Sequence, residues 1–266
     1  MGDLKTFFIA TFNANGIRAR MHIILKWLEK NRVDCLCIQE TKVQDADFPE
    51  APFTEAGFNV IFRGQKAYNG VAVISPHEIE APVFGFSDGQ GEDDDETRLA
   101  RCTIKGIRVV NTYVPQGRAI DDPNYQKKLA WFARLKRLFE EQYSRDEPIV
   151  WCGDMNVAPT PLDVYHPEKK EDHVCYHVDA RRAFNDVVEW GFVDLFRKFH
   201  PDEPKQYTFY DYRLPKAVER GLGWRIDHIL ATRPLAERAV DCWIDLEPRK
   251  WKKPSDHTFL AARFQG

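Results

Sequence analysis

The chain has 266 residues, with 38 Lys and Arg against 41 Asp and Glu, a formal net charge of -3 and 43% apolar residues. This length is enough for one large α/β domain, and no apolar run reaches the roughly 18–20 residues that a membrane helix needs. The first residues lead directly into a strand-like segment with no signal-peptide pattern, so we expect a cytoplasmic protein that spans no membrane.

The first half of the chain predicts a series of strands interrupted by two helices. Apolar residues at helical spacing, from Ile23 to Leu28, predict an amphipathic helix over 19–31. The near-continuous apolar run 33–38 predicts a strand buried on both faces. The remaining predicted elements are strands at 5–12, 59–63, 70–75, 99–104 and 108–114, and a long helix over 123–143.

The second half resembles the first in outline. It predicts strands at 148–152, 207–210, 225–232, 239–245 and 257–264, a helix over 179–190, and a long loop over 159–178. Many strands with few helices between them favour sheets packed on each other with helices outside. We find no linker composition, so residues 1–266 are expected to form one domain.

Cysteines and clustered charges give weaker indications. The six cysteines are dispersed, mostly within apolar runs, and predict buried reduced thiols without disulfides or structural zinc. The acidic run Glu92-Asp93-Asp94-Asp95-Glu96 predicts a solvated loop, and the Lys and Arg residues of the 123–143 helix, Lys128 among them, predict a solvated helix face. Residues 205–253 hold 11 Lys and Arg against 7 Asp and Glu, which leaves an anionic partner open.

Polar residues recur directly after the predicted strands. These residues are Asn13, Glu40, Tyr113, Asp154 with Asn156, Asp227, and Asp256 with His257. Each alone has an ordinary structural explanation, such as an Asx-turn at Asp154 or a hydrogen-bonded structural histidine at His257. Because equivalent strand ends meet at one edge of a sheet, we expect these side chains to converge on one pocket.

Several carboxylates in one cleft repel each other unless a cation neutralises them. Oxygen-rich ligands favour a hard cation such as Mg²⁺, with Mn²⁺ as a substitute, and no cysteine–histidine cluster suited to zinc is present in the sequence. A carboxylate-bound Mg²⁺ beside a His–Asp pair suits phosphodiester hydrolysis.

Seven motifs, in order and at compatible spacing, resemble the exonuclease III family of apurinic/apyrimidinic endonucleases, within the endonuclease/exonuclease/phosphatase superfamily. In chain order, the residues that carry these motifs are Phe12-Asn13-Ala14-Asn15-Gly16, Gln39-Glu40-Thr41-Lys42, Tyr68-Asn69-Gly70, Tyr113-Val114-Pro115-Gln116-Gly117, Gly153-Asp154-Met155-Asn156, Gly223-Trp224-Arg225-Ile226-Asp227 and Pro254-Ser255-Asp256-His257. The resemblance implies a four-layer α/β sandwich with two central mixed β-sheets flanked by helices.

The resemblance also implies roles for the residues at the strand ends. Glu40 would be the principal Mg²⁺ ligand, and the metal region would include Asn13, Asp154, Asn156, Asp256 and His257. Asp154 would orient or deprotonate the attacking water with help from Asn156, while His257 paired with Asp227 would contact the scissile phosphate. Tyr113 would contact phosphate or assist the leaving group. Either Asp154 or the His257–Asp227 pair could be the general base.

The implied substrate is duplex DNA with abasic sites or free 3′ ends, bound by a monomer. Asn15, Arg98 and Arg118 match positions near the metal or the DNA, and an apolar pocket for a flipped abasic sugar would be formed by Phe209, Trp224 and Ile226. The chain departs from some relatives in carrying Asn15 where they have an acidic residue, and in the segment around His173, where they have asparagines.

The expected reaction is therefore incision of the backbone 5′ to an abasic site, with trimming of 3′ ends. A phosphatase or phosphodiesterase of the same fold, acting on a small or lipid phosphate, is the main alternative. A catalytically inactive DNA-binding relative is a third. It is disfavoured because Glu40, Asp154, Asp227 and His257 are all present.

Overall fold

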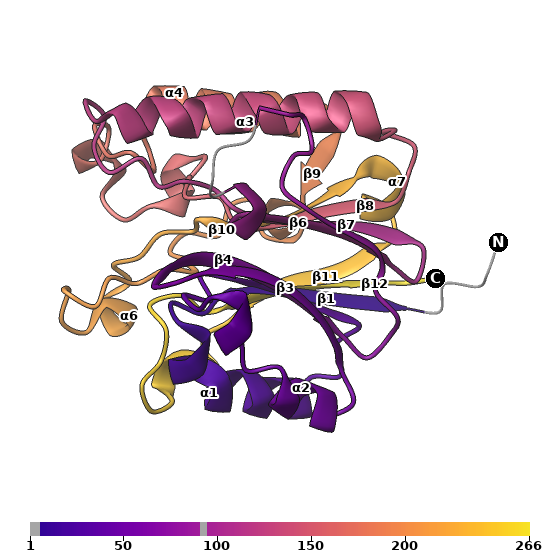
Figure 1. Ribbon diagram of the computed structural model, residues 1–266. Coiled ribbons are helices and arrows are strands. Elements are labelled where there is room, and N and C mark those ends of the chain that lie inside the picture. The colour runs from indigo at the N-terminus through magenta and orange to yellow at the C-terminus, as the bar shows by residue number, and fades with distance from the viewer. Residues whose placement is uncertain (1–5, 91–94) are drawn as a thin grey trace.

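Two β-sheets lie face to face between two layers of helices (Figure 1) in the computed structural model, which describes residues 6–90 and 95–266. This arrangement confirms the four-layer α/β sandwich expected from the sequence. Both sheets are mixed, since each combines one parallel pair of strands with antiparallel neighbours.

The two sheets have six strands each among the described residues. The first has the order β11 (Ala239–Asp245), β12 (Phe259–Phe264), β1 (Phe7–Asn13), β2 (Cys35–Gln39), β4 (Tyr68–Ser75), β3 (Asn59–Gln65). The second has the order β5 (Glu80–Phe84), β6 (Leu99–Ile104), β7 (Ile107–Tyr113), β8 (Ile149–Asp154), β10 (Asp227–Thr232), β9 (Phe192–Asp194). In both, the parallel pair occupies the third and fourth places, so the two halves of the chain share one pairing pattern.

Helices cover the outer face of each sheet. The helices are α1 (Ile17–Lys30), α2 (Ala51–Glu55), α3 (Pro123–Gln142), α4 (Val178–Val188), α5 (Leu195–Phe199), α6 (Ala217–Arg220) and α7 (Arg233–Ala236). Figure 1 shows α1 and α2 below the first sheet and α3 and α4 above the second. Asp122 caps α3 by accepting a hydrogen bond from the Asn124 amide, and Pro123 takes the first helical position, where its missing N–H is harmless.

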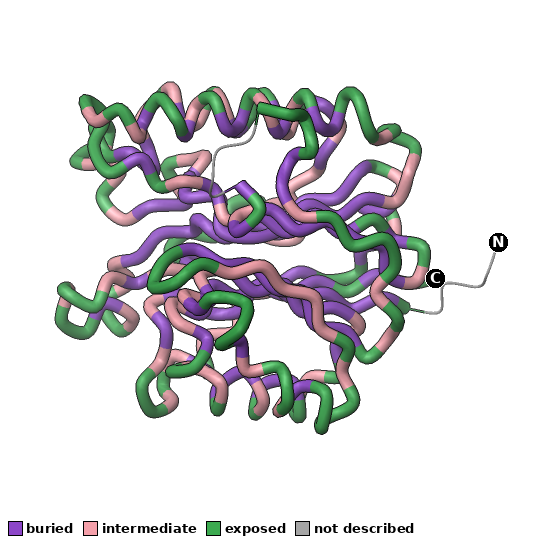
Figure 2. The backbone as a smooth tube through the Cα atoms, viewed as in Figure 1, coloured by how far each residue is buried: buried purple, intermediate pink, exposed green. Residues whose placement is uncertain are grey.

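Apolar residues bury three interfaces between these four layers. One cluster joins the two sheets through residues such as Ile9, Val109 and Ile229. The other two lie between each sheet and its helices, around Trp27 and Phe132. The inner strands of both sheets are purple in Figure 2 because strands covered on two faces are almost wholly buried, whereas the edge strands β3 and β5 are partly exposed. This burial explains the near-continuous apolar runs in the sequence.

Most predicted elements are confirmed within a few residues, with one wrong strand and several omissions. Residue 5, the expected start of the first strand, lies outside the described residues. Residues 207–210 do not form a strand: Phe209 makes isolated bridges to Trp224 and His257. The sequence did not predict β5, an exposed strand containing Pro82, or β9, which has three residues.

Two predictions about charged residues are wrong in part, although Lys127 and Arg137 on α3 and Glu96 in the acidic run are exposed as expected. Lys128 on α3 is fully buried rather than solvated, and Arg134 on the same helix pairs with Asp88 and Asp95 at 3.0 and 2.8 Å. Of the acidic run at 92–96, residues 92–94 lie outside the described residues, and Asp95 is buried. The helix therefore turns some of its basic residues toward the protein.

The six cysteines are all buried, as expected. Burial raises the pKa of Cys35 and Cys175 to about 11 and that of Cys102 to about 12, because the thiolate is poorly solvated in the core. Within the described parts of the chain, no helix has both the length and the apolar character to cross a membrane.

Candidate active site

The polar residues predicted at strand ends come together at one edge of the sandwich. Asn13 and Asp154 end the strands β1 and β8. Asp227 begins β10, which runs antiparallel to β8, so it lies directly opposite Asp154 in the register. Tyr113 is the register partner of Asp154 on the other side. The sheet pairing thus places residues far apart in sequence within one site.

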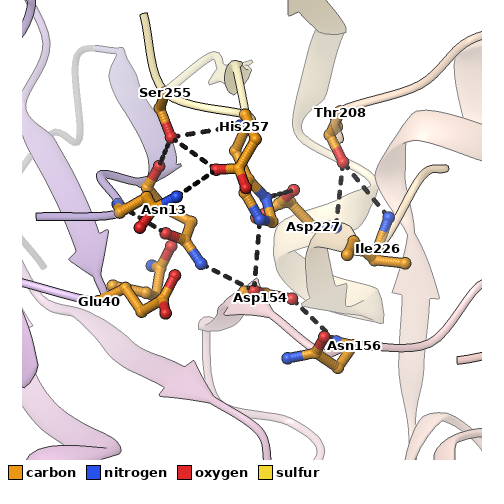
Figure 3. Close-up of polar contacts among 12 residues, drawn as sticks. Asn13, Glu40, Asp154, Asn156, Thr208, Ile226, Asp227, Ser255 and His257 are labelled. Atoms are coloured by element: carbon orange, nitrogen blue, oxygen red, sulfur yellow. Dashed lines mark hydrogen bonds and ion pairs between the residues drawn. The ribbon is translucent and has the colours of Figure 1, made fainter. Parts of the chain in front are cut away.

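Three buried ionisable side chains form the centre of this site (Figure 3). Asp154, Asp227 and His257 each offer one potential ligand atom, and these atoms all lie within 4.8 Å of one another. His257 Nδ1 is 2.7 Å from Asp227 Oδ2, and its Nε2 is 3.8 Å from Asp154 Oδ2. The imidazole therefore bridges the two carboxylates.

Two asparagines fix the Asp154 carboxylate. Asn13 Nδ2 donates to Asp154 Oδ2 at 2.8 Å, and the backbone N–H of Asn156 donates to Asp154 Oδ1 at 2.9 Å. Asn156 has a left-handed backbone with φ 49°, a conformation that asparagine adopts more readily than most residues. The preceding Gly153 has φ 131°, and a side chain there would collide with the Thr112 carbonyl oxygen. The strand end is shaped by residues suited to that backbone.

Burial and neighbouring charges shift the pKa values of this cluster in predictable directions. Burial raises the pKa of Asp154 to about 7, against the opposing effect of His257 and with the help of Asp227. Burial alone would lower the pKa of His257, but its charge interaction and hydrogen bond with Asp227 outweigh this effect and raise that pKa to about 10. The pKa of Tyr113 is raised by burial and by Glu40 and Asp154.

Glu40 and Asp256 lie in a second group, next to the first. Lys42 Nζ is 3.1 Å from Glu40 Oε1 and donates to Asn15 Oδ1 at 2.5 Å. Asn15 Nδ2 in turn donates to Asp256 Oδ1 at 2.9 Å, and the backbone N–H of Asn15 donates to Asn13 Oδ1 at 2.9 Å. Asn13 therefore links the two groups, and the two remaining acidic residues are held through Asn15 and Lys42.

Three residues of this second group have positive φ angles. Asn15, Glu40 and Lys42 have φ angles of 45°, 56° and 55°, in a region that residues with a Cβ seldom adopt. Such backbone strain persists only where the surrounding structure enforces it, and it is common at functional sites. The turns after β1 and β2 are thus held in conformations that aim these side chains at the site.

Two hydroxyl residues support the site without having been predicted. Ser255 Oγ donates to the Asn13 carbonyl at 2.8 Å and accepts a hydrogen bond from the His257 amide at 3.2 Å. Thr208 Oγ1 accepts from the amides of Ile226 and Asp227 at 3.3 and 3.2 Å. Ser255 lies within a recognised motif, so its position was a usable signal. Thr208 lies in the segment wrongly predicted as a strand and offered none.

The residues expected to contact substrate surround the cluster at varying depth. The Phe209 ring lies 4.9 Å from the His257 ring, and Trp224 pairs with Phe209 through a β-bridge. Trp224 and Ile226 are nearly buried in the core beneath α3 and α4, at 6% and 4% exposure. The His173 ring, from the long loop, packs on Trp224 at 4.5 Å. An aromatic wall therefore adjoins the carboxylates.

The two expected phosphate contacts differ in their surroundings. Arg98 donates to the Tyr113 carbonyl at 3.3 Å, and its guanidinium lies 5.0 Å from the Tyr113 ring centre. Arg118 is exposed on the loop that follows Tyr113, with a left-handed φ of 58°. Arg98 is thus held against the site, while Arg118 extends from the rim.

The donor set is compatible with a divalent cation. Asp227 Oδ1 is buried and makes no hydrogen bond within the described residues. An unpaired buried carboxylate oxygen is costly, and a cation or an ordered water is the usual remedy. The cluster offers two carboxylates and one imidazole, and the carboxylates of Glu40 and Asp256 lie in the neighbouring group, so oxygen ligands predominate, as suits Mg²⁺ or Mn²⁺.

Comparison with known proteins agrees with this arrangement. The Endonuclease/Exonuclease/phosphatase family matches residues 10–257. The chain is 32% identical to exodeoxyribonuclease III of Haemophilus influenzae, over 96% of this chain and 98% of that protein. An AP endonuclease structure from Archaeoglobus fulgidus is similar with a TM-score of 0.95 and 54% identity, over 98% of this chain and 100% of that one. A 3′-5′ exonuclease structure from Neisseria meningitidis is similar with a TM-score of 0.93 and 35% identity, over 98% and 100% of the two chains. The chain belongs to the Endonuclease/Exonuclease/phosphatase family.

Proposed function

We propose that this protein is a divalent-metal-dependent DNA repair phosphodiesterase that cuts the backbone 5′ to abasic sites and removes nucleotides or blocking groups from 3′ ends of duplex DNA. The main support is the buried Asp154–His257–Asp227 cluster beside an aromatic wall, in a chain whose relatives bear the names exodeoxyribonuclease III and AP endonuclease. We further propose that residues 1–266 act as a single catalytic domain, as a monomer in the cytoplasm.

In this proposal Asp154 is the general base that orients and deprotonates water. A pKa near the working pH suits a general base, and burial raises the pKa of Asp154 to about 7. Asn156 fixes the carboxylate and the nearby backbone. His257, with its pKa raised by Asp227, stays protonated at neutral pH and donates to the phosphate, which is less consistent with His257 as the base. Tyr113 contacts the phosphate or the leaving oxygen.

We propose Mg²⁺, with Mn²⁺ as a substitute, as the cation. Glu40 is the principal ligand in this proposal, and Asn13, Asp154, Asn156, Asp256 and His257 line the metal region, with the protonated His257 facing the phosphate and not ligating the cation. When bound, the cation offsets the repulsion among the carboxylates and stabilises negative charge on the phosphate. Lys42 pairs with Glu40 in the structure, so this lysine compensates the carboxylate charge from the protein side.

Substrate recognition is proposed for the aromatic wall and the rim. Phe209, Trp224 and Ile226 would accept a flipped abasic sugar and exclude a normal base by size. Arg98, Arg118 and Asn15 would contact the DNA backbone near the site, since the planar guanidinium group can donate two parallel hydrogen bonds to phosphate. The basic balance of residues 205–253 is consistent with a polyanionic substrate.

A cleavage assay tests this function. It compares an end-labelled duplex that contains one synthetic abasic site with an intact duplex, each incubated with Mg²⁺ and with EDTA. Metal-dependent incision 5′ to the lesion, faster than digestion of intact DNA, is the expected result. Equal shortening of both duplexes would indicate chiefly a 3′ exonuclease. No cleavage of either would refute the proposal and favour a small phosphate substrate. An Asp227→Asn variant should be inactive, whereas Asp241→Asn, at an exposed position on β11, is the matched control.

A further inference from the structure

Lys128 is a fully buried cation beneath the candidate active site. It lies on α3 with 0% exposure and donates to three backbone carbonyl oxygens, at 3.1 Å from Gln116, 2.7 Å from Asn156 and 2.7 Å from Val174. A lysine ammonium has three N–H donors, so this geometry uses all of them. The charge is therefore solvated by peptide groups, and no carboxylate of the described residues forms an ion pair with it.

The three carbonyls belong to three different loops around the site. Gln116 follows β7 and Tyr113, Asn156 follows β8 and Asp154, and Val174 adjoins the ring that packs on Trp224. Gln116 lies between β7 and α3, whereas Asn156 and Val174 lie near the two ends of the long connection between β8 and α4, and Lys128 is a common hydrogen-bond partner of all three. The ammonium thus ties the proposed water-orienting loop to the proposed substrate-binding loops.

The contact to Asn156 is the most consequential of the three. Asn156 has a left-handed backbone that must be held in place, and three contacts do so. Its amide donates to Asp154 at 2.9 Å, its side chain donates to the Val114 carbonyl at 3.0 Å, and its carbonyl accepts from Lys128 at 2.7 Å. Removing Lys128 would release one of these restraints beside the Asp154 carboxylate.

The electrostatic environment agrees with this role. A buried charge is retained only where its hydrogen-bonding is complete, and replacing it by an apolar group would leave buried carbonyl groups without a donor. A simple packing role would be served as well by leucine or methionine.

We propose that Lys128 is a positioning residue for the reaction, holding Asn156 and through it Asp154 in register with the loops at 114–118 and 173–177. This inference depends on the proposed function for its kinetic part. It also makes a structural claim, the coupling of three loops through one ammonium, which can be measured without activity.

The test compares Lys128→Met with Leu135→Ala, a buried α3 residue outside the site that also disrupts packing. At a temperature where both variants are folded, we expect Lys128→Met to lower the single-turnover incision rate by at least about tenfold while DNA affinity in EDTA changes less than about threefold. Leu135→Ala should keep the wild-type rate within about twofold. Lys128→Arg, which keeps the charge and several N–H donors, should recover part of the lost rate.

Hydrogen exchange supplies the second measurement. Segments 114–118, 155–158 and 173–177 should all exchange faster in Lys128→Met but not in Leu135→Ala. Equal rate losses in both variants, or a wild-type rate in Lys128→Met, would overturn the proposal. If Lys128→Met does not fold, Lys128→Gln takes its place. A wild-type incision rate with unchanged hydrogen exchange in Lys128→Gln would also overturn the proposal. An inactive wild-type protein would refute the proposed function, and the exchange data alone would then decide the coupling.

Discussion

Replacing Asp154 by asparagine should greatly reduce turnover and at the same time stabilise the metal-free fold. Burial raises the pKa of Asp154 from 3.8 to about 7. A pKa difference of one unit corresponds to about 1.4 kcal/mol, so ionising this carboxyl costs about 4 kcal/mol more in the folded protein than in the unfolded chain. Because the folded pKa is the higher one, this penalty is absent below about pH 4, grows up to about pH 7 and is complete above it.

Asparagine removes that penalty but introduces smaller losses. Asp154 accepts from two donors, Asn13 Nδ2 and the Asn156 amide, whereas an asparagine offers one oxygen and one amide nitrogen. One donor would then face another donor, at a cost of about 1–3 kcal/mol. His257 also loses one of the carboxylates that raise its pKa. The balance is a gain of about 2 kcal/mol at pH 8, or about 5 °C in melting temperature at this size.

Thermal unfolding of wild-type and Asp154→Asn protein in EDTA at pH 8, repeated at pH 5, measures this effect. The gain should shrink at pH 5, where the penalty is smaller. Incision of an abasic duplex in Mg²⁺ should fall by about 10²–10⁴, the usual contribution of a general base. A lower melting temperature for the variant at pH 8 would refute the electrostatic reasoning. Near-normal turnover would remove Asp154 from the catalytic role.

Three further substitutions test other parts of the site. Mg²⁺ at a hundredfold excess over Kd should stabilise the wild-type fold by about 2.7 kcal/mol, and Glu40→Gln should reduce this stabilisation, measured as a smaller rise in melting temperature. An Mg²⁺ titration equal to that of the surface control Glu29→Gln would remove Glu40 from the metal region. Asp163, whose pKa is lowered by Arg225 and Arg197 despite burial, contributes stability above about pH 4 that is lost as the pH falls through its lower folded pKa. Asp163→Asn should therefore lose about 3 kcal/mol at pH 7 but less at pH 3 in urea unfolding, and an equal loss at both pH values would contradict this linkage. Arg118→Ala should lower the salt dependence of DNA binding by about one released ion, and an unchanged slope between 50 and 200 mM salt would exclude a phosphate contact.

The site could be predicted from sequence to the extent that strand ends determine it. Tyr113 and Asp154 end strands and Asp227 begins one, so pairing within one sheet brings these three together, and the packing of the two sheets adds Asn13 from the end of β1. Of the two supporting hydroxyl residues, Ser255 lies in a recognised motif, whereas the contact from Thr208 could not be predicted because it comes from a loop. The Thr208 side chain accepts a hydrogen bond from the Asp227 backbone amide. It belongs to the segment 207–210, whose apolar residues resemble those of a strand, but this segment pairs through the isolated bridges of Phe209.

The prediction that Lys128 lies on a solvated helix face was wrong for a different reason. The buried positions on α3 include Tyr125, Lys128, Phe132 and Leu135, a regular spacing of three or four residues. Lys128 thus occupies the apolar stripe, and its position alone predicted burial. Residue type was given more weight than position, because lysine is seldom fully buried. Only the three-dimensional structure supplies the carbonyl groups that make such burial tolerable.

The burial of every cysteine gives this protein a practical property. All six thiols are buried, and burial raises the pKa of those at positions 35, 102 and 175 to about 11 or 12. The thiolate is the reactive form, so maleimide reagents have no accessible native target on the folded protein. A cysteine introduced at Val178 on α4 or Val240 on β11, both 47% exposed, would therefore be the single labelling point on its layer. Paired spin labels or fluorophores there could report distance changes across the sandwich while DNA is bound, without first deleting any native thiol.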